Sequence, residues 1–222
     1  MGPVIRRRGM RHGPAVLAVA ALFGLPLVGC NLFKPTDPEP PSSRVVLRTD
    51  YSFPDSTLRT IALAIADKGE NGRLAYLNAL ADTTRDGRGF HAIFLPEVVR
   101  RFQAANATIP DDWNRDRESR FYFNFVAKQP GAYGMSWELD VRDPDLIDET
   151  AGSATLYRRY EVQAALVGGS SVTLALGFAR LDFILATGNR WVIIRWEDRL
   201  PPAPPGDYPD DLTFGSRRLE LQ

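Results

Sequence analysis

The spacing of apolar residues changes from a helical period to an alternating one about halfway along the chain. In the first half, apolar side chains recur every three or four residues, which predicts amphipathic helices. The first helix is expected to begin at Asp55 or Ser56, either of which can cap it, and to stop at Gly69. A second helix is expected to follow directly and to end at the turn of residues 86–89. The apolar positions that define these helices are Leu58, Ile61, Ala62 and Ile65, and then Leu74, Leu77, Leu80 and Ala81.

A short apolar run at residues 90–95 predicts a strand or an extended segment. Pro96 can then begin a third helix, because the N–H that proline lacks has no partner in a first turn. Its inward residues are expected to be Val98, Val99 and Phe102. We interpret the charged stretch at residues 111–118 as a solvated loop, because it lacks the central glycine and the terminal glutamate of a calcium-binding loop.

Beyond Trp113 the period becomes two, which predicts strands with one apolar face. Further strands are expected at residues 155–167 and 171–185. The turn at residues 187–190 predicts a hairpin that returns through residues 191–196. The chain then leaves the sheet at its prolines 201, 202, 204 and 205, and residues 213–222 form a short closing segment. The first two predicted strands are defined by Phe121, Phe123 and Phe125, and by Met135, Trp137, Leu139 and Val141.

The N-terminus has the three zones of an export signal: a basic stretch, an apolar run at residues 15–28, and then Gly29-Cys30. The sequence Leu27-Val28-Gly29-Cys30 resembles the lipobox of bacterial lipoproteins. That resemblance implies that a lipid is attached to Cys30 and that the chain is cut just before it. The alternatives are an uncleaved signal anchor with an inert cysteine, and a twin-arginine signal at Arg6-Arg7-Arg8.

These zones predict three regions: a signal peptide at residues 1–29, a lipidated cysteine with a proline-rich linker at 30–44, and one folded domain at 45–222. The composition, 44% hydrophobic and 24% charged, suits a globular domain with one core. The 27 basic and 27 acidic residues balance, but four arginines and no acid lie in residues 1–29. The remainder is therefore mildly acidic, which argues against a nucleic-acid partner.

Helices followed by an antiparallel meander make an α+β domain. The layout resembles the NTF2-like cone fold, a group that includes SnoaL-like proteins and ketosteroid isomerase. The residues that carry the likeness are the helix pair at 56–82, the segment at 90–102, and the hairpin Gly177-Phe178-Ala179-Arg180-Leu181-Asp182-Phe183 with Gly188-Asn189-Arg190-Trp191-Val192-Ile193. The resemblance implies helices packed on a curved antiparallel sheet around a hollow cone. It does not imply one function, because this architecture hosts enzymes and binding subunits alike.

Two residues are weak catalytic candidates. His91 is the only histidine after residue 12, and it could point into the cone as a general base; its alternative is a structural group with a hydrogen bond. Asp182 lies in the most apolar strand, where a carboxylate needs a partner. We favour its pairing with Arg180 or Arg195 over a role as a catalytic acid.

Trp113, Glu138 and Tyr160 are candidates for a ligand site, since aromatic walls with a few polar groups are typical of small-molecule pockets. The alternative for the aromatic residues is core packing. No spacing of histidine and cysteine predicts a metal site, and no motif predicts a cofactor.

The leading hypothesis is a membrane-anchored cell-envelope lipoprotein, held to the bilayer through Cys30. Its domain is expected to be non-catalytic and to bind a small apolar ligand or a protein partner. The alternatives are an isomerase or hydrolase that uses a residue inside the cone, and a structural lipoprotein that forms a homodimer through the sheet face. Asn31, which follows the lipidated cysteine, favours the outer membrane over the inner one.

Overall fold

The computed structural model describes residues 47–200 and 210–222. The predicted signal peptide and the whole of the predicted linker at residues 30–44, including Cys30, lie outside these residues. The elements run in the order α2 (Pro54–Asp67), α3 (Glu70–Asn78), α4 (Thr83–Asp86), β1 (His91–Ile93), α5 (Pro96–Ala104), α6 (Arg115–Ala127), β2 (Tyr133–Leu139), β3 (Leu146–Asp148), β4 (Ser153–Ala165), β5 (Ser171–Ala186), β6 (Arg190–Arg199), a 3-10 turn η3 (Asp210–Leu212) and α7 (Phe214–Glu220).

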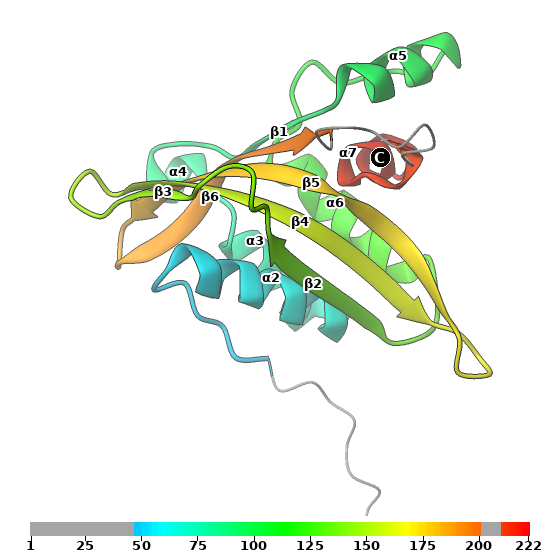
Figure 1. Cartoon of the computed structure of the whole chain (residues 1–222), viewed down its shortest axis with the longest axis horizontal. Helices are drawn as coiled ribbons and strands as arrows, with labels where there is room; N and C mark the ends of the chain where they lie inside the picture. The colour runs from blue at the N-terminus through cyan, green and yellow to red at the C-terminus, as the bar shows by residue number, and fades with distance from the viewer. Residues whose placement is uncertain (1–46, 201–209) are drawn as a thin grey trace, which may run out of the picture. The chain divides into compact units, whose positions relative to one another are not determined.

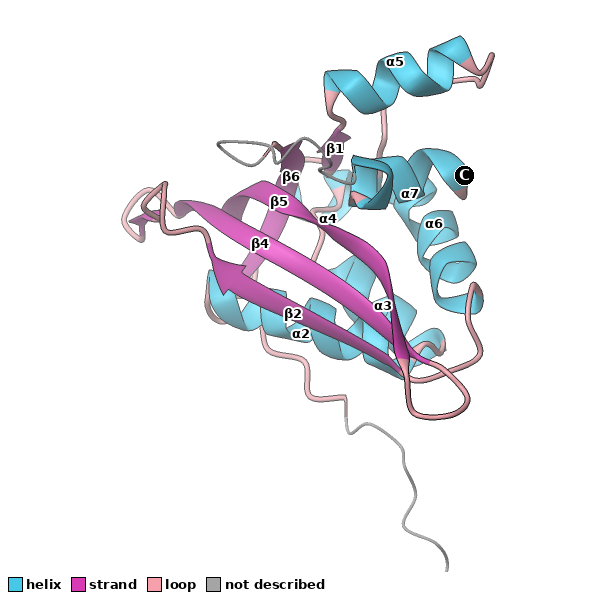
Figure 2. Cartoon of the chain, turned by 45° about the vertical axis from the view of Figure 1, so that its right-hand side comes forward, coloured by secondary structure: helices cyan, strands magenta, loops and turns pink. Residues whose placement is uncertain are grey.

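The domain is α+β, with helices packed on a curved sheet, as the sequence predicted. Helices α2 and α3 lie against the sheet, with α6 and α7 further along it, while α5 extends away from the sheet (Figures 1 and 2). The sheet order is β1-β6-β5-β4-β2, and β3 pairs with β4 beyond the end of β2. One pairing differs from the expected antiparallel sheet: β1 runs parallel to β6, so the sheet is mixed.

Helix α2 forms where its apolar period predicted it, but the second predicted helix is shorter than expected. Helix α3 ends at Asn78, and Leu80, which was expected on its apolar face, instead forms a bridge with Ile193 of β6. The separate short helix α4 then precedes the turn at residues 86–89. Leu74 was expected to face inward, but it lies on the outer side of α3 and is 47% exposed.

Helix α2 begins at Pro54 with Phe53 in the cap position, so neither Asp55 nor Ser56 is the cap as expected; the hydroxyl of Ser56 accepts a hydrogen bond from the N–H of Phe53. The helix is capped at its C-terminus by Lys68, which takes the left-handed conformation at φ 59°, whereas Gly69 was the expected stop.

The predicted strand at Phe121, Phe123 and Phe125 is wrong, because these residues belong to helix α6. The side chain of Asn114 caps α6 by accepting a hydrogen bond from the N–H of Arg117. Phe121 and Phe125 are buried one turn apart, whereas Phe123 is exposed. The charged stretch that we interpreted as a solvated loop therefore supplies the first turn of this helix.

The remaining strands follow the predicted alternation. Strands β4 and β5 pair antiparallel along their whole length, and the β5–β6 hairpin turns through Gly188 and Asn189, both with positive φ. Register shifts in both pairings bend the sheet. Val141 was expected to continue the strand of Trp137, but β2 ends at Leu139 and Val141 is exposed. The segment where the chain was expected to leave the sheet, at prolines 201, 202, 204 and 205, lies outside the described residues.

Candidate functional site

Aromatic rings fill the space between the sheet and the helices, where a hollow cone was expected. Phe214 of α7 lies at the centre of the cluster, with its ring centroid 4.9 Å from that of Tyr160 and 5.0 Å from that of Trp196. Edge-to-face and tilted packing of this kind stabilises a core beyond the area that it buries. The rings of the cluster, all closed to solvent, are Trp113, Phe121, Phe125, Tyr160, Trp196 and Phe214.

A buried ion pair lies within this aromatic cluster. Arg218 of α7 and Glu118 of α6 both have fully buried side chains, and Nη2 of Arg218 is 2.8 Å from Oε1 of Glu118. The same carboxylate accepts hydrogen bonds from the hydroxyl of Tyr76 and the indole N–H of Trp113, each at 2.5 Å. Several charge-assisted donors on one carboxylate offset the cost of removing it from water.

The guanidinium of Arg218 also packs on aromatic faces. Its central carbon lies 4.7 Å from the ring centroid of Trp196. Nη1 of Arg218 has no hydrogen-bond partner among the described residues. The fully buried pair with Glu118 raises the pKa of Arg218 beyond its ordinary value, despite the opposing effect of burial, so this side chain stays charged.

Asp198 of β6 is a second buried carboxylate beside the same cluster. It accepts hydrogen bonds from the backbone N–H of Gly215 at 2.5 Å, the hydroxyl of Tyr160 at 3.1 Å and the indole of Trp196 at 3.2 Å. Burial raises the pKa of Asp198, while Arg218 and these donors act in the opposite direction. The network ties α7 to the sheet and gives each of its two buried carboxylates, Glu118 and Asp198, several donors.

The three predicted ligand residues do not converge on one site. Trp113 and Tyr160 belong to the buried aromatic cluster. Each donates a hydrogen bond to a buried carboxylate, Trp113 to Glu118 and Tyr160 to Asp198. Glu138 lies on the opposite face of the sheet, exposed, with Oε2 2.6 Å from Nη1 of Arg159. The lipidation candidate Cys30 lies outside the described residues.

His91 does not point into the cone. It faces outward from β1, and its Nδ1 lies 2.6 Å from Oδ1 of Asp112, with both side chains about half exposed. The expectation that His91 acts inside the cone is therefore wrong, because the side chains of β1 alternate and Ala92 takes the inward position. Asp182 also faces outward, where it accepts hydrogen bonds from Arg180 Nε at 3.0 Å and Thr155 Oγ1 at 2.8 Å.

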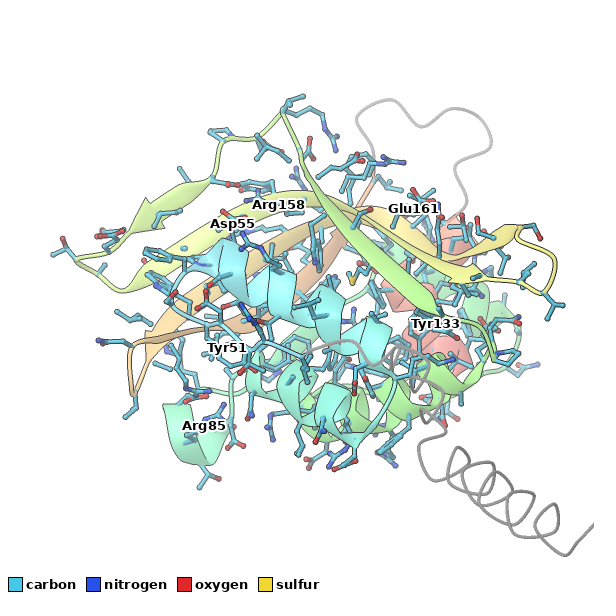
Figure 3. The ribbon with its side chains drawn as sticks, turned by 90° about the horizontal axis from the view of Figure 1, so that it is seen from below. Tyr51, Asp55, Arg85, Tyr133, Arg158 and Glu161 are labelled. Carbon is cyan, nitrogen blue, oxygen red and sulfur yellow. The ribbon has the colours of Figure 1, made fainter. Side chains whose placement is uncertain are left out.

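The outer face of the sheet carries ion pairs made within the sheet itself. Arg180 with Asp182, Arg195 with Glu197, and Arg159 with Glu138 neutralise one another across this face. On the helix-facing side, Arg158 of β4 contacts both Asp55 at the start of α2 and Asp145 in the loop before β3, at 2.8 and 2.7 Å (Figure 3). Arg158 thus holds the first helix and this loop to the sheet.

Three neighbouring hollows open at the end of the sheet where β1 and β6 lie. The first, about 370 Å³, lies between Asp82, Thr83, His91, Asp112 and Arg115. The second and third, about 550 and 560 Å³, lie over the outer face and share Arg88 and Ile194. These surface hollows, unlike the filled interior, have room for a ligand.

Within residues 47–200 and 210–222, no three histidine, cysteine, aspartate or glutamate side chains gather where they could hold a metal ion. In the same part of the chain, no helix has the length and apolar character needed to cross a bilayer.

No protein-family model matches the sequence, and the search of curated proteins finds no relative. Solved structures with a similar layout include a function-unknown protein from Mycobacterium tuberculosis, 13% identical, with a TM-score of 0.46 over 75% of this chain and 86% of that one. A proposed dehydratase of the NTF2-like family from Streptomyces avermitilis is 11% identical, with a TM-score of 0.44 over 66% of this chain and 92% of that one. An NTF2-like superfamily protein from Salmonella enterica is 11% identical, with a TM-score of 0.41 over 68% and 92%. These likenesses concern the layout of the fold and carry no activity to this chain.

The sequence carries two indirect signals of the Glu118–Arg218 pair. Glu118 lies three and seven residues before Phe121 and Phe125, which is the spacing of one helix face. Arg218 follows Phe214 by four residues in the same way. The expected role of residues 111–118 as a loop concealed the first of these two patterns.

Proposed function

We propose that this protein is a cell-envelope lipoprotein, tethered to a membrane through a lipid on Cys30, whose NTF2-like domain is a non-catalytic binding module. The module works through its outer surface rather than through an interior site. The observation that carries this proposal is the aromatic interior closed around Glu118 and Arg218. A substrate that entered this space would have to displace packed rings and separate a buried ion pair, which costs several kcal/mol.

The tether rests on the order of the N-terminal zones and on Leu27-Val28-Gly29-Cys30. One acyl chain binds a bilayer only marginally, so stable anchoring needs more than one chain on the mature N-terminus. Asn31 in the following position supports the outer membrane as the destination, which separation of inner and outer membranes by density would test.

Metabolic labelling of the full chain with an alkyne fatty acid in a bacterial host tests the tether. We expect label on the wild-type chain and its recovery with membranes. The Cys30→Ser variant should carry no label, and because Cys30 is the only cysteine, no other thiol can substitute for it. An unlabelled wild-type chain that still sediments with membranes would indicate an uncleaved signal anchor instead.

A hydrolase or isomerase is the second candidate, and the contact between His91 and Asp112 favours it. A carboxylate on Nδ1 fixes the tautomer that leaves Nε2 free to accept a proton, at the edge of the 370 Å³ hollow. Turnover of a chromogenic ester that is lost in both His91→Ala and Asp112→Asn would establish this candidate and contradict the non-catalytic one.

Self-association through the sheet face is the third candidate. Since that face carries paired charges, a dimer formed on it would depend on ionic strength. Light scattering at low and high salt tests this, and a monomer under both conditions at high concentration would rule it out.

A further inference from the structure

The outer face of the sheet changes from paired charges to apolar side chains near its β1 edge. The apolar residues there are Ile184 of β5, Ile194 of β6 and Ile93 of β1. Leu146 and Ile147 of β3, which pairs with β4, line the same hollow as Ile184 and Ile194. Ile93, Leu146 and Ile147 are 40%, 60% and 50% exposed. The second and third hollows run over these residues and meet at Arg88 and Ile194, so they form one groove across the sheet.

Two arginines offer unused donors to this groove. Arg88 follows Gly87, whose left-handed conformation ends α4, and its guanidinium has no hydrogen-bond or ion-pair partner among the described residues. Nε of Arg195 is buried and also lacks an acceptor, while Nη2 of Arg195 is held by Glu197 at 2.8 Å. A buried donor without an acceptor is costly, so an acceptor supplied by a ligand would be stabilised there.

The described lining of the groove has two acidic residues, of which only Asp182 forms an ion pair. Asp182 accepts from Arg180 and Thr155, and Asp148 accepts from the N–H of Ala151 at 2.8 Å. His91 borders the same groove and is paired with Asp112. Asp148, on β3, keeps its negative charge, because a backbone N–H donates a hydrogen bond without neutralising it. Among the described lining residues, the positive charge without a counter-ion lies at Arg88, where the two hollows meet.

We propose that this groove binds an amphipathic organic anion, with its carboxylate between Arg88 and Arg195 and its apolar body over Ile194 toward Ile147. Each of the two joined hollows falls within the range of about 300–1,000 Å³ that is typical of small-molecule sites. The inference rests on the proposed function in one respect, that the domain binds through its outer surface. It requires neither the lipid on Cys30 nor a membrane.

The test uses the full chain in lipid nanodiscs and the probe 4-phenylbutyrate, followed by ligand-observed NMR. Arg88→Ala removes the free cation, and Ile147→Ser shortens the apolar wall; both side chains are exposed, so neither change is expected to unfold the domain. Arg59→Ala, an exposed arginine on α2, is the matched control. The amide 4-phenylbutyramide has the same apolar body without the charge, and empty nanodiscs correct for partition into lipid.

We expect saturable binding of 4-phenylbutyrate that is at least tenfold weaker in Arg88→Ala, weaker in Ile147→Ser and unchanged in Arg59→Ala. The amide should bind at least tenfold more weakly than the acid. Equal affinity of wild type and Arg88→Ala, equal affinity for acid and amide, or no saturable binding to the wild-type chain would each overturn the proposal. The labelling of Cys30 is measured separately, and a chain that carries no lipid is titrated in solution without nanodiscs, so failure of the tether is distinguished from failure of this proposal.

Discussion

Nη2 of Arg218 lies 2.8 Å from Oε1 of Glu118, although the two residues are 100 positions apart in the chain and both are closed to solvent. The pair joins α7 to α6 across the centre of the domain. It explains why a short C-terminal helix closes the interior: the helix supplies both Phe214, the ring at the centre of the cluster, and the cation that Glu118 requires.

Removal of one partner of this pair should destabilise the domain strongly. In Glu118→Gln, Arg218 remains buried without its paired carboxylate, and we expect a loss of about 3–5 kcal/mol in the free energy of unfolding. The double variant Glu118→Gln, Arg218→Met removes that charge and should regain part of the loss. Urea denaturation followed by circular dichroism measures both, and a double variant less stable than the sum of its single changes would contradict this account.

Phe121 and Phe123 separate the helical interpretation of α6 from the strand that the sequence suggested. Phe121→Ala should cost about 3–5 kcal/mol because its ring is buried in the aromatic cluster. Phe123→Ala, the matched control on the exposed side, should cost less than about 1 kcal/mol. Similar losses at both positions, measured by thermal unfolding, would be inconsistent with the helix.

Gly177 is required by a close approach between strands. A Cβ at this position would lie 2.3 Å from the hydroxyl oxygen of Tyr160, which is fixed by Asp198 and the N–H of Phe214. Gly177→Ala should therefore destabilise the domain by about 1–3 kcal/mol. Gly134→Ala on β2 meets no atom within 4 Å and serves as the control. The two melting temperatures should differ clearly, and equal values would remove the steric argument.

Asp198 should impose a pH dependence of its own on stability. Burial raises its pKa in the folded state above the ordinary value of 3.8, so the folded state holds this proton more tightly than the unfolded state. The stabilisation from this proton is complete below about pH 4 and is lost as the pH rises through the folded pKa. Asp198→Asn, which stays neutral, should therefore gain stability relative to wild type as the pH rises. A difference between the two that is constant from about pH 3 to 8 would contradict the shift.

Local patterns were sufficient where one face of an element is buried. The 3.6-residue period at Leu58, Ile61 and Ile65 predicted α2, and the pattern of residues 155–167 and 171–185 predicted the long strands β4 and β5, because burial on one face selects side chains at that spacing. The pattern failed at Phe121, Phe123 and Phe125. Three aromatic residues at alternate positions fit a strand over so short a length. Tyr122 and Val126 complete the buried face of the helix, but in a strand they would lie on the face opposite the three phenylalanines.

The sequence by itself determined the α+β class and most of the order of helices and strands, since these depend on residues close together in the chain; the segment from Phe121 to Phe125 is the exception. The export motif that ends at Cys30 stays a prediction. Only the tertiary structure decided what occupies the interior and which way His91 and Asp182 face. Those outcomes depend on contacts such as Glu118 with Arg218, which link distant segments. No local period encodes a partner 100 residues away. The filled interior and the groove at Arg88 on the outer face therefore depend on how the helices pack on the sheet, and no local pattern in the sequence predicted them.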